Sequence, residues 1–340
     1  MPDITLVTSD GSRLGFACPP DTNVLDAAAA AGLFLPAMCR EGSCGLCHAH
    51  VGEGTYELGT YTPNALTDAD DSGVLLCRCR PRSDLVIDLP YTQNGIQHHD
   101  VPTRDALIEA LDPAGAGAVR MTLVFTPDST LGQAADFVPG QYMEVAIPGT
   151  SIRRAYSLAN LPNWEGRLEF LIRLQPNGAF STYLGTTARV GDRLIVRGPL
   201  GNFVLDETSP RPRCLIGGGC GFAPVLSMLR HLADFQDTQP THLIFGATQE
   251  DELFPAAEIA ALREALPQLG VTLSVWRPGP AWTGFTGTAA DALRAYLRVN
   301  GDSPDVYVCG PPKLLDAVTG VAREHGIPAE QIIAERVFQT

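Results

Sequence analysis

In the N-terminal segment, short hydrophobic runs alternate with polar turns around one alanine-rich run. Asp21-Thr22 precedes the alanine-rich run as a helix cap, and Gly32 ends it. The predicted strands are 4–8, 14–17 and 84–89, and the predicted helix is 24–31. This pattern predicts a small α+β domain. The polar stretch 92–103 that follows is typical of a linker.

The middle of the chain, from about 106 to 205, has strand-like periodicity throughout. Hydrophobic and polar residues alternate in runs that Gly and Pro turns separate, which is typical of a small antiparallel barrel. The predicted strands are 118–125, 142–147, 168–174 and 193–197.

After Pro210-Arg211-Pro212 the pattern becomes strand, glycine loop and helix. A hydrophobic strand at 214–216 leads into the glycine loop 217–221, and Pro224 suits the first turn of the helix that follows. Further strands are predicted at 241–245, 271–275 and 305–309. The segment therefore predicts a parallel α/β sheet.

The charge of the chain limits its classes of function. Its 340 residues include 38 Asp and Glu against 24 Lys and Arg, a net charge of −14. Phosphate binding requires clustered cations, so a nucleic-acid partner is not expected. Residues 1–95 carry 12 acidic and 5 basic side chains, net −7. A solvated surface and electrostatic steering toward a cationic protein both explain this acidity.

Cysteine usage and hydropathy indicate the compartment. Nine cysteines without a signal peptide favour a reducing interior, and the cytoplasm is the expected location. The longest uncharged apolar stretch, 27–39, contains Gly32 and Pro36 and is too short to span a bilayer. Membrane insertion is therefore not expected.

Four cysteines have the spacing that ligates a plant-type [2Fe–2S] cluster: Cys39, Cys44 and Cys47 as C-x4-C-x2-C, and the distant Cys77. Their loop must wrap three sulfurs around two irons. Gly42 and Gly45 permit the sharp backbone bends that this requires.

Other uses of these cysteines fit less well. A zinc ribbon needs two C-x2-C pairs, and only Cys44 and Cys47 form one. A thioredoxin-like pair leaves the preceding cysteine unexplained. Rieske ligation needs histidine–cysteine pairs in two separate loops, so His48 and His50 are expected to be strand residues. Cys79 is expected to point away from the cluster ligands and not to bind metal.

Arg154-Ala155-Tyr156-Ser157 places a cation, an aromatic ring and a hydroxyl in one predicted strand. Arg154 and Tyr156 share a face because they are two residues apart. An edge-strand Arg with a half-buried Tyr explains the motif equally well when it is taken alone. Further on, Gly178 to Leu184 predicts a turn and a short helix whose N–H groups and hydroxyls can bind a pyrophosphate.

The glycine loop Gly217 to Gly221 lets the backbone approach a pyrophosphate at the positive end of the next helix. Phe222 stands where the strict dinucleotide fingerprint has its last glycine. Cys309-Gly310-Pro311-Pro312 follows the last predicted strand, where ligands of parallel sheets lie. A buried cysteine packed at the strand end is the alternative explanation of Cys309.

In this order, the cysteine, R-A-Y-S, glycine-loop and C-G-P-P motifs resemble the reductase components of bacterial multicomponent oxygenases. Stretches such as Val74 to Arg78 and Asp88 to Tyr91 are most similar to soluble methane, alkene and propane monooxygenase reductases. The resemblance implies a multidomain α+β and α/β protein. Its expected parts are a β-grasp [2Fe–2S] ferredoxin domain at 1–95, a linker at 96–104, an antiparallel β-barrel FAD domain at 105–208 and a doubly wound NAD domain at 209–340.

The resemblance also implies roles for single residues. Tyr156 would lie against the isoalloxazine and Ser157 near its N5. The flavin contacts expected are Arg154, Ala155, Tyr156, Ser157, Gly178, Ser181 and Thr182. The dinucleotide contacts expected are Gly218, Gly219, Cys220, Gly221, Pro224, Cys309, Gly310 and Pro311. Ser157 and Cys309 are the expected catalytic residues, with Cys309 at nicotinamide C4.

Two positions depart from the family pattern. The family usually has Thr where Cys220 stands, so a weaker thiol donor replaces the hydroxyl or its hydrogen bond is missing. The ending Glu335-Arg336-Val337-Phe338 resembles an E-K-F ending displaced by one residue. This leaves open whether Phe338 covers the flavin.

The choice of nucleotide is predicted from charge. The acidic run Thr248 to Glu252 follows the second strand of this segment, and no Lys or Arg lies between Arg230 and Arg263. Selection for NADPH normally needs a cation near the 2′-phosphate. The sequence therefore favours NADH, with Glu250 among the expected contacts.

The resemblance implies hydride transfer from NADH to FAD and single-electron transfer through the cluster to an oxygenase. The expected acceptor is the hydroxylase component of an alkane or alkene monooxygenase. A reductase for a ring-hydroxylating dioxygenase or a cytochrome P450, and a redox subunit or sensor without turnover of its own, are the alternatives. The chain is expected to be a monomer.

Overall fold

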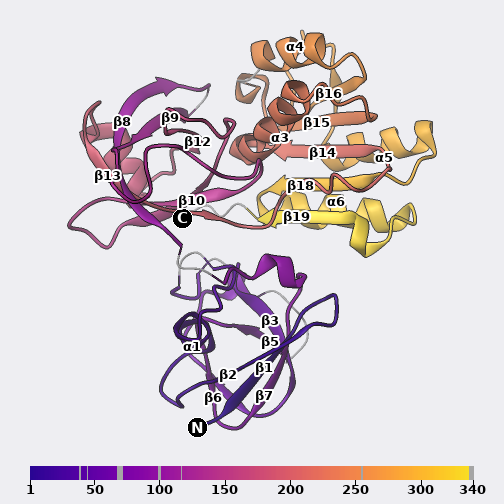
Figure 1. The fold of residues 1–340 in the computed structure, drawn as a ribbon. Coiled ribbons are helices and arrows are strands. Elements are labelled where there is room, and N and C mark those ends of the chain that lie inside the picture. Colours follow the sequence, from indigo (N-terminus) through magenta and orange to yellow (C-terminus); the bar gives the residue numbers. More distant parts are fainter. Residues whose placement is uncertain are drawn as a thin grey trace. The chain divides into compact units, whose positions relative to one another are not determined.

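The computed structural model describes residues 1–37, 40–43, 45–66, 72–98, 101–115, 117–253 and 256–336 (Figure 1). The chain divides into two compact units. The first comprises Met1–Thr103, Arg153–Ala155 and Leu200–Asn202, and the second comprises Arg104–Ile152, Tyr156–Pro199 and Phe203–Thr340. None of the helices in the described part of the chain is long and apolar enough to cross a membrane.

The first unit contains a five-stranded mixed sheet in the order β2-β1-β7-β3-β5 and a separate pair, β4 and β6. Strand β1 is antiparallel to β2 and parallel to β7, whereas β3 is antiparallel to both β7 and β5. This is the predicted β-grasp arrangement. The bounds are β1 Asp3–Val7, β2 Arg13–Ala17, β3 His48–Glu53, β4 Tyr56–Leu58, β5 Gly73–Leu75, β6 Cys79–Pro81 and β7 Leu85–Asp88.

Helix α1 (Val24–Ala30) contributes buried residues to the hydrophobic core of this unit. Its N-cap is Asn23, whose side-chain oxygen accepts a hydrogen bond of 2.8 Å from the Asp26 backbone N–H. The predicted cap at Asp21-Thr22 is wrong. Asn23 is the last extended residue before the helix, so its carboxamide is the one within reach of the first turn.

The second unit begins with a six-stranded antiparallel sheet in the order β11-β10-β13-β8-β9-β12. A bridge between Leu158, directly after β11, and Phe170 of β12 joins the two ends of this order, which closes the sheet into the predicted barrel. The bounds are β8 Thr103–Pro113, β9 Ala118–Phe125, β10 Tyr142–Ala146, β11 Arg153–Ser157, β12 Arg167–Arg173 and β13 Arg193–Leu200.

The rest of the second unit is a six-stranded parallel sheet in the order β17-β16-β15-β14-β18-β19. This order is that of a doubly wound fold, as predicted. The strands are β14 Arg213–Gly218, β15 Thr241–Ala247, β16 Leu269–Val275, β17 Phe285–Thr286, β18 Asp305–Gly310 and β19 Ile332–Arg336.

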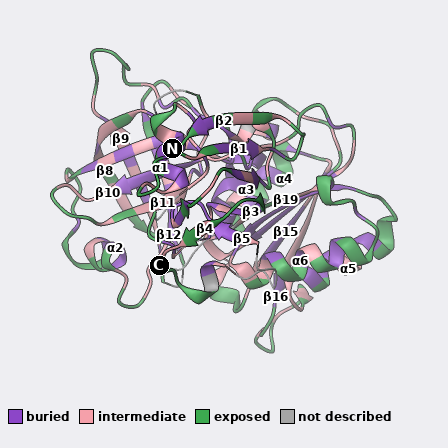
Figure 2. Cartoon of the chain, turned by 90° about the horizontal axis from the view of Figure 1, so that it is seen from below, coloured by how far each residue is buried: buried purple, intermediate pink, exposed green. Residues whose placement is uncertain are grey.

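Both faces of this sheet are covered by helices. Leu215 and Leu243 pack in one cluster with α3 (Phe222–Asp234) and α4 (Ala256–Ala265). Neighbouring residues of the same strands, such as Ile216 and Ile244, pack in another cluster with α5 (Ala289–Asn300) and α6 (Pro312–Glu324). Figure 2 shows the resulting alternation of buried and exposed positions along α5 and α6. The carboxyl ends of the strands are the part of such a sheet that binds nucleotides.

Candidate functional site

Two of the four predicted cluster ligands, Cys47 and Cys77, lie close together in the first unit. Both residues are buried, each with 3% of its surface exposed. The Leu76 backbone N–H donates to the Cys47 carbonyl oxygen at 2.9 Å. This hydrogen bond brings Cys77, the next residue along the chain, close to Cys47. Cys39 and Cys44 lie outside the described residues. Two buried thiols on hydrogen-bonded neighbouring segments fit ligation of an iron–sulfur cluster.

The cluster loop contains the two glycines in the conformation that the sequence predicts. Gly42 and Gly45 have φ values of +77° and +74°, a region that side chains with a Cβ rarely adopt. A Cβ on Gly45 would lie 2.7 Å from the Ala65 carbonyl oxygen. Glycine is therefore required at Gly45 both by the backbone angle and by the close approach of a neighbouring turn.

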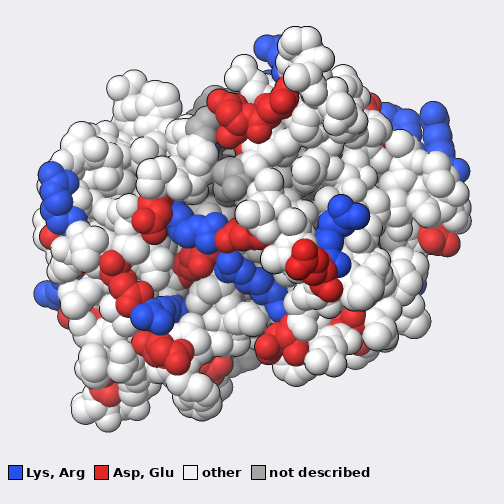
Figure 3. All heavy atoms as spheres, turned by 90° about the horizontal axis from the view of Figure 1, so that it is seen from above, with Lys and Arg blue, Asp and Glu red and all other residues white. Residues whose placement is uncertain are grey.

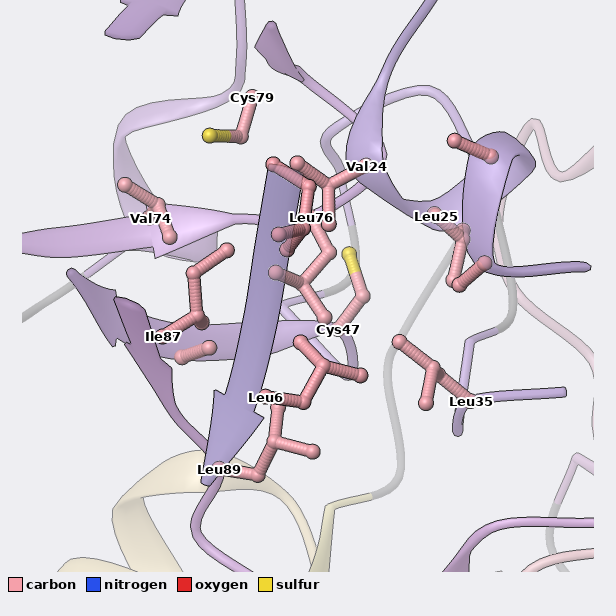
Figure 4. Packing of buried hydrophobic residues seen from close by; sticks show 14 of the residues in the cluster. Leu6, Val24, Leu25, Leu35, Cys47, Val74, Leu76, Cys79, Ile87 and Leu89 are labelled. Carbon is pink, nitrogen blue, oxygen red and sulfur yellow. The ribbon is translucent and has the colours of Figure 1, made fainter. Parts of the chain in front are cut away.

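Cys79 has the structural role that the sequence predicts for it. Its side chain is fully buried in the core of the first unit, and its sulfur points away from that of Cys47 (Figure 4). Burial, together with the neighbouring Cys18, raises the pKa of the Cys79 thiol to about 12. The thiol therefore stays protonated at neutral pH. His48 and His50 lie in β3, which confirms that they are strand residues.

The R-A-Y-S motif lies on β11, as expected. The Arg154 Nη1 atom donates to the Arg153 carbonyl oxygen at 2.7 Å. Its Nε atom is buried and has no hydrogen-bond partner among the described residues. The Tyr156 ring packs against Phe180, with ring centroids 5.3 Å apart. An unsatisfied buried donor on the motif fits an anionic ligand such as the FAD phosphate.

The predicted turn and short helix after β12 are present. Gly178 precedes the four-residue helix α2 (Ala179–Thr182). The Ser181 hydroxyl accepts a hydrogen bond of 2.9 Å from the Gln175 backbone N–H, so this side chain holds the turn in shape. The Thr182 backbone N–H donates to the Gly178 carbonyl oxygen at 2.8 Å. The structure therefore brings all three predicted diphosphate contacts into one turn.

The glycine loop and the end of β18 are in contact, as the sequence predicts for a nucleotide site. A Cβ on Gly221 would lie 2.5 Å from the Cys309 carbonyl oxygen, and one on Gly218 would lie 2.5 Å from Leu314. Gly310 lies next to Gly218. These glycines allow the loop to pass directly over the strand end. Cys220 and Pro224 continue this segment into the 3₁₀ turn and α3.

Cys309 is paired with a residue that the sequence did not identify as part of the site. Parallel pairing of β18 and β19 places Glu335 opposite Cys309. The Glu335 Oε2 atom is buried without a hydrogen-bond partner among the described residues, and burial raises the pKa of this carboxyl to about 8. Burial, and then Glu335, raise the pKa of the Cys309 thiol well above its ordinary value. Both groups are therefore mainly protonated at pH 7. Phe338 lies outside the described residues.

An ion pair links the barrel to the nucleotide-binding sheet beside the glycine loop. The Arg173 Nη2 atom lies 2.6 Å from Glu252 Oε1, and Glu252 Oε2 accepts from the Thr248 backbone N–H at 2.8 Å. A Cβ on Gly219 would lie 3.8 Å from Arg173 Nη1. Burial is the main cause that raises the pKa of the Cys220 thiol to about 12. The charge of Arg173 lowers this pKa, and the charge of Glu252 raises it. The pairing of distant segments explains why the sequence did not predict this contact.

A second set of charges joins the same two parts. Arg120 of β9 and Glu169 of β12 meet Arg230 of α3 and Glu258 of α4, with N–O distances from 2.6 to 3.3 Å. Arg230 also donates to the Ala159 carbonyl oxygen at 2.8 Å. Figure 3 shows acidic and basic side chains lying next to one another on the face viewed from above. These contacts fix the barrel against the nucleotide-binding sheet.

Glu250, a predicted nucleotide contact, has a structural partner. Its Oε1 atom accepts a hydrogen bond of 2.7 Å from the Gly279 backbone N–H. The carboxylate thus ties the loop after β15 to the loop after β16. Both loops follow strands at the nucleotide-binding edge of the sheet.

Family models match three successive parts of the chain. They are described as a 2Fe-2S iron-sulfur cluster binding domain for residues 7–82, an oxidoreductase FAD-binding domain for 121–205 and an oxidoreductase NAD-binding domain for 215–320. The matches follow the order of the motifs in the sequence, and the NAD-binding match covers both the glycine loop and the C-G-P-P motif.

Similar proteins span nearly the whole chain. The chain is 39% identical over 303 residues to methane monooxygenase component C of Methylosinus trichosporium, which covers 88% of both chains. It is 33% identical over 318 residues to the toluate 1,2-dioxygenase electron transfer component of Pseudomonas putida, covering 92% of this chain and 91% of the relative. A solved cytochrome P450 reductase of Amycolatopsis is similar with a TM-score of 0.73 and 26% identity, covering 98% of each chain.

A cluster-binding part joined to FAD- and NAD-binding parts defines an NADH-dependent flavin iron–sulfur oxidoreductase. The chain belongs to the family of reductase components of bacterial multicomponent oxygenases, within the ferredoxin–NADP⁺ reductase superfamily. The predictions of family, fold class, cofactors and enzyme class are thereby confirmed. In such a protein electrons pass from NADH through FAD to the [2Fe–2S] cluster.

Proposed function

We propose that the electron acceptor of this reductase is the hydroxylase component of an alkane- or alkene-type monooxygenase. The observation that carries the proposal is the 39% identity to a methane monooxygenase component, against 33% to the toluate dioxygenase component. A ring-hydroxylating dioxygenase or a cytochrome P450 is the second candidate. It is favoured by the dioxygenase relative and by the P450 reductase with a similar fold.

We propose that the acidic first part of the chain docks on a basic surface of the acceptor. Residues 1–95 carry a net charge of −7, the most negative part of the sequence. Complementary charge raises the rate of encounter between redox partners and makes that rate depend on salt. The acceptor surface should accordingly be rich in Lys and Arg.

The flavin site is proposed to follow the family roles. Arg154 would bind a phosphate, which its unsatisfied Nε atom supports. Tyr156, already packed among aromatic rings, would lie against the isoalloxazine, with Ala155 and Ser157 on either side of it in β11. The proposed diphosphate contacts are Gly178, Ser181 and Thr182.

The proposed NADH contacts lie at the carboxyl edge of the parallel sheet: Gly218, Gly219, Cys220, Gly221, Pro224, Glu250, Cys309, Gly310 and Pro311. Bound FAD supplies hydride acceptance and the cluster supplies single-electron transfer. The chain itself orients these groups. Fully buried Cys309 and the buried Glu335 Oε2 atom lie together at the strand end. Phe338 is a further proposed cofactor contact.

The organisation of the chain is also a proposal. It comprises a ferredoxin domain at 1–95, a linker at 96–104, a barrel domain at 105–208 and a nucleotide domain at 209–340. We propose that the protein is cytoplasmic, because nine cysteines, four of them in a cluster spacing, suit a reducing compartment. We also propose that it is a monomer.

The electron path is tested with Cys44→Ser in the purified reductase. NADH oxidation with ferricyanide should persist, whereas reduction of cytochrome c should be lost because it needs the cluster. Unchanged cytochrome c turnover would contradict the path. The acceptor is tested by NADH-driven turnover of purified monooxygenase, dioxygenase and P450 partners. Faster reduction of either of the last two would overturn the monooxygenase assignment.

A further inference from the structure

The loops after two neighbouring nucleotide-domain strands run side by side beyond the ends of those strands. The Trp276 backbone N–H donates to the Ala247 carbonyl oxygen at 3.0 Å, and the Arg277 backbone N–H donates to the Thr248 carbonyl oxygen at 3.0 Å. Trp276 and Arg277 therefore continue β16 alongside the residues that follow β15. Dinucleotides bind at this edge of a parallel sheet.

The two side chains form a stacked pair on the surface. The Arg277 Cζ atom lies 4.2 Å from the centroid of the Trp276 ring. Trp276 is 52% exposed, so its large ring is available as a contact surface. Such a ring offers a flat face to a base, and the guanidinium beside it offers a fork of donors to a phosphate.

The positive charge of Arg277 is not neutralised by the acidic turn beside it. Among the described residues, no carboxylate lies within ion-pair distance of Arg277. Glu250 accepts from the Gly279 backbone N–H at 2.7 Å, and Glu252 pairs with Arg173 at 2.6 Å. Glu250 and Glu252, two of the three carboxylates of the turn, are thus held by other donors, and the Glu250 contact fixes the loop that carries Arg277.

We propose that Trp276 and Arg277 form the adenosine end of the nucleotide site and that Arg277 lets the reductase use NADPH as well as NADH. This inference rests on the proposed nucleotide site and names a second substrate for it. NADPH differs from NADH by a doubly charged 2′-phosphate, which an arginine near the ribose accommodates. The sequence did not reveal this cation because Arg277 follows the third strand, outside the interval from Arg230 to Arg263.

The test is steady-state kinetics of the holoenzyme with ferricyanide as acceptor. In the wild type, kcat/KM for NADPH should lie within about a hundredfold of that for NADH. Arg277→Gln should lower kcat/KM for NADPH at least tenfold and that for NADH less than threefold. Trp276→Ala should raise KM for both nucleotides. Arg298→Gln, an exposed arginine at the end of α5, is the control and should change neither.

A second measurement needs no variant. Inhibition of NADH oxidation by 2′-AMP should be stronger than inhibition by 5′-AMP in the wild type. The inference would be overturned if Arg277→Gln lowered kcat/KM equally for both nucleotides or left kcat/KM for NADPH unchanged. It would also be overturned if 2′-AMP inhibited NADH oxidation less than 5′-AMP does. Failure of the wild type to oxidise NADH would instead contradict the proposed function, so the two failures are distinguishable.

Discussion

Arg173, the last residue of barrel strand β12, forms an ion pair with Glu252, which follows strand β15 of the parallel sheet. The nitrogen–oxygen distance is 2.6 Å, and the Glu252 side chain is only 16% exposed. The pair lies beside Gly219 of the glycine loop. It therefore couples the position of the flavin barrel to the shape of the nucleotide loop.

A double-mutant cycle should detect this coupling. We expect Arg173→Ala and Glu252→Ala to interact by about 1 kcal/mol in the free energy of unfolding, because one partner is largely buried. The more exposed pair Arg294 and Glu324, with side chains 32% and 63% exposed, is the control and should couple less. Denaturant unfolding of the holoenzyme measures both. Equal coupling in the two cycles would show that the Arg173 pair has no special role.

Replacing Gly45 by alanine should weaken cluster retention. The substitution forces a Cβ into a backbone with φ of +74° and to 2.7 Å from the Ala65 carbonyl oxygen. Gly11→Ala is the matched control, since Gly11 has φ of +81° but no heavy atom within 4 Å of its Cβ position. In the control, backbone strain alone should lower the free energy of unfolding by about 1 to 2 kcal/mol. Iron content and thermal unfolding compare the two, and full iron retention in Gly45→Ala would refute the expectation.

Cys77, the fourth predicted ligand, and the neighbouring Cys79 should respond differently to replacement by serine. Cys77→Ser should lose the cluster, whereas Cys79→Ser should keep it and lose about 1 to 3 kcal/mol of stability from a hydroxyl buried in the core. Iron and acid-labile sulfide analysis of each purified variant makes the comparison. Loss of iron in Cys79→Ser at the level of Cys77→Ser would mean that Cys79 also ligates the metal.

Glu335 should make stability fall as pH rises. Burial raises the pKa of this carboxyl from 4.5 to about 8 in the folded chain. Between these values the folded state binds more protons than the unfolded state, so stability decreases with rising pH and levels off above pH 8. At roughly 1.4 kcal/mol per pKa unit, the shift of about 3.5 units corresponds to a full change of about 5 kcal/mol.

Glu335→Gln should remove that slope. Denaturant unfolding of the holoenzyme at pH 5, 6, 7 and 8 would measure it, and the exposed carboxyl variant Glu330→Gln is the control. A wild-type profile that stays parallel to that of Glu335→Gln across this range would disprove the assignment of the slope to Glu335.

Local patterns were enough to predict most of the fold. Strand β9 lies within the bounds that hydrophobic alternation predicts, and Gly42 and Gly45 adopt the bends that the cluster spacing demands. Strand β8 was not predicted, because a register irregularity between Ile108 and Ala110 breaks its alternation. Strand β19 was also missed, since it is short and lies at the edge of its sheet.

The contacts missed in the site are those between residues far apart in the sequence. Glu335 meets Cys309 only through the register of two parallel strands, and Arg173 meets Glu252 across two sheets. Arg277 reaches the acidic turn only because β16 lies next to β15. Periodicity and spacing describe neighbours along the chain, so they do not identify pairs that tertiary packing creates.

The strand order of the two sheets has a consequence for synthesis on the ribosome. Strand β7 completes the sheet of the first unit at Asp88, before any barrel strand has been made. Strand β14, in contrast, has its partner β15 soon after it but waits for β18, which begins only at Asp305. One edge of this hydrophobic strand thus lacks its native neighbour during most of the translation of the C-terminal part, the interval in which a nascent chain is most prone to aggregate.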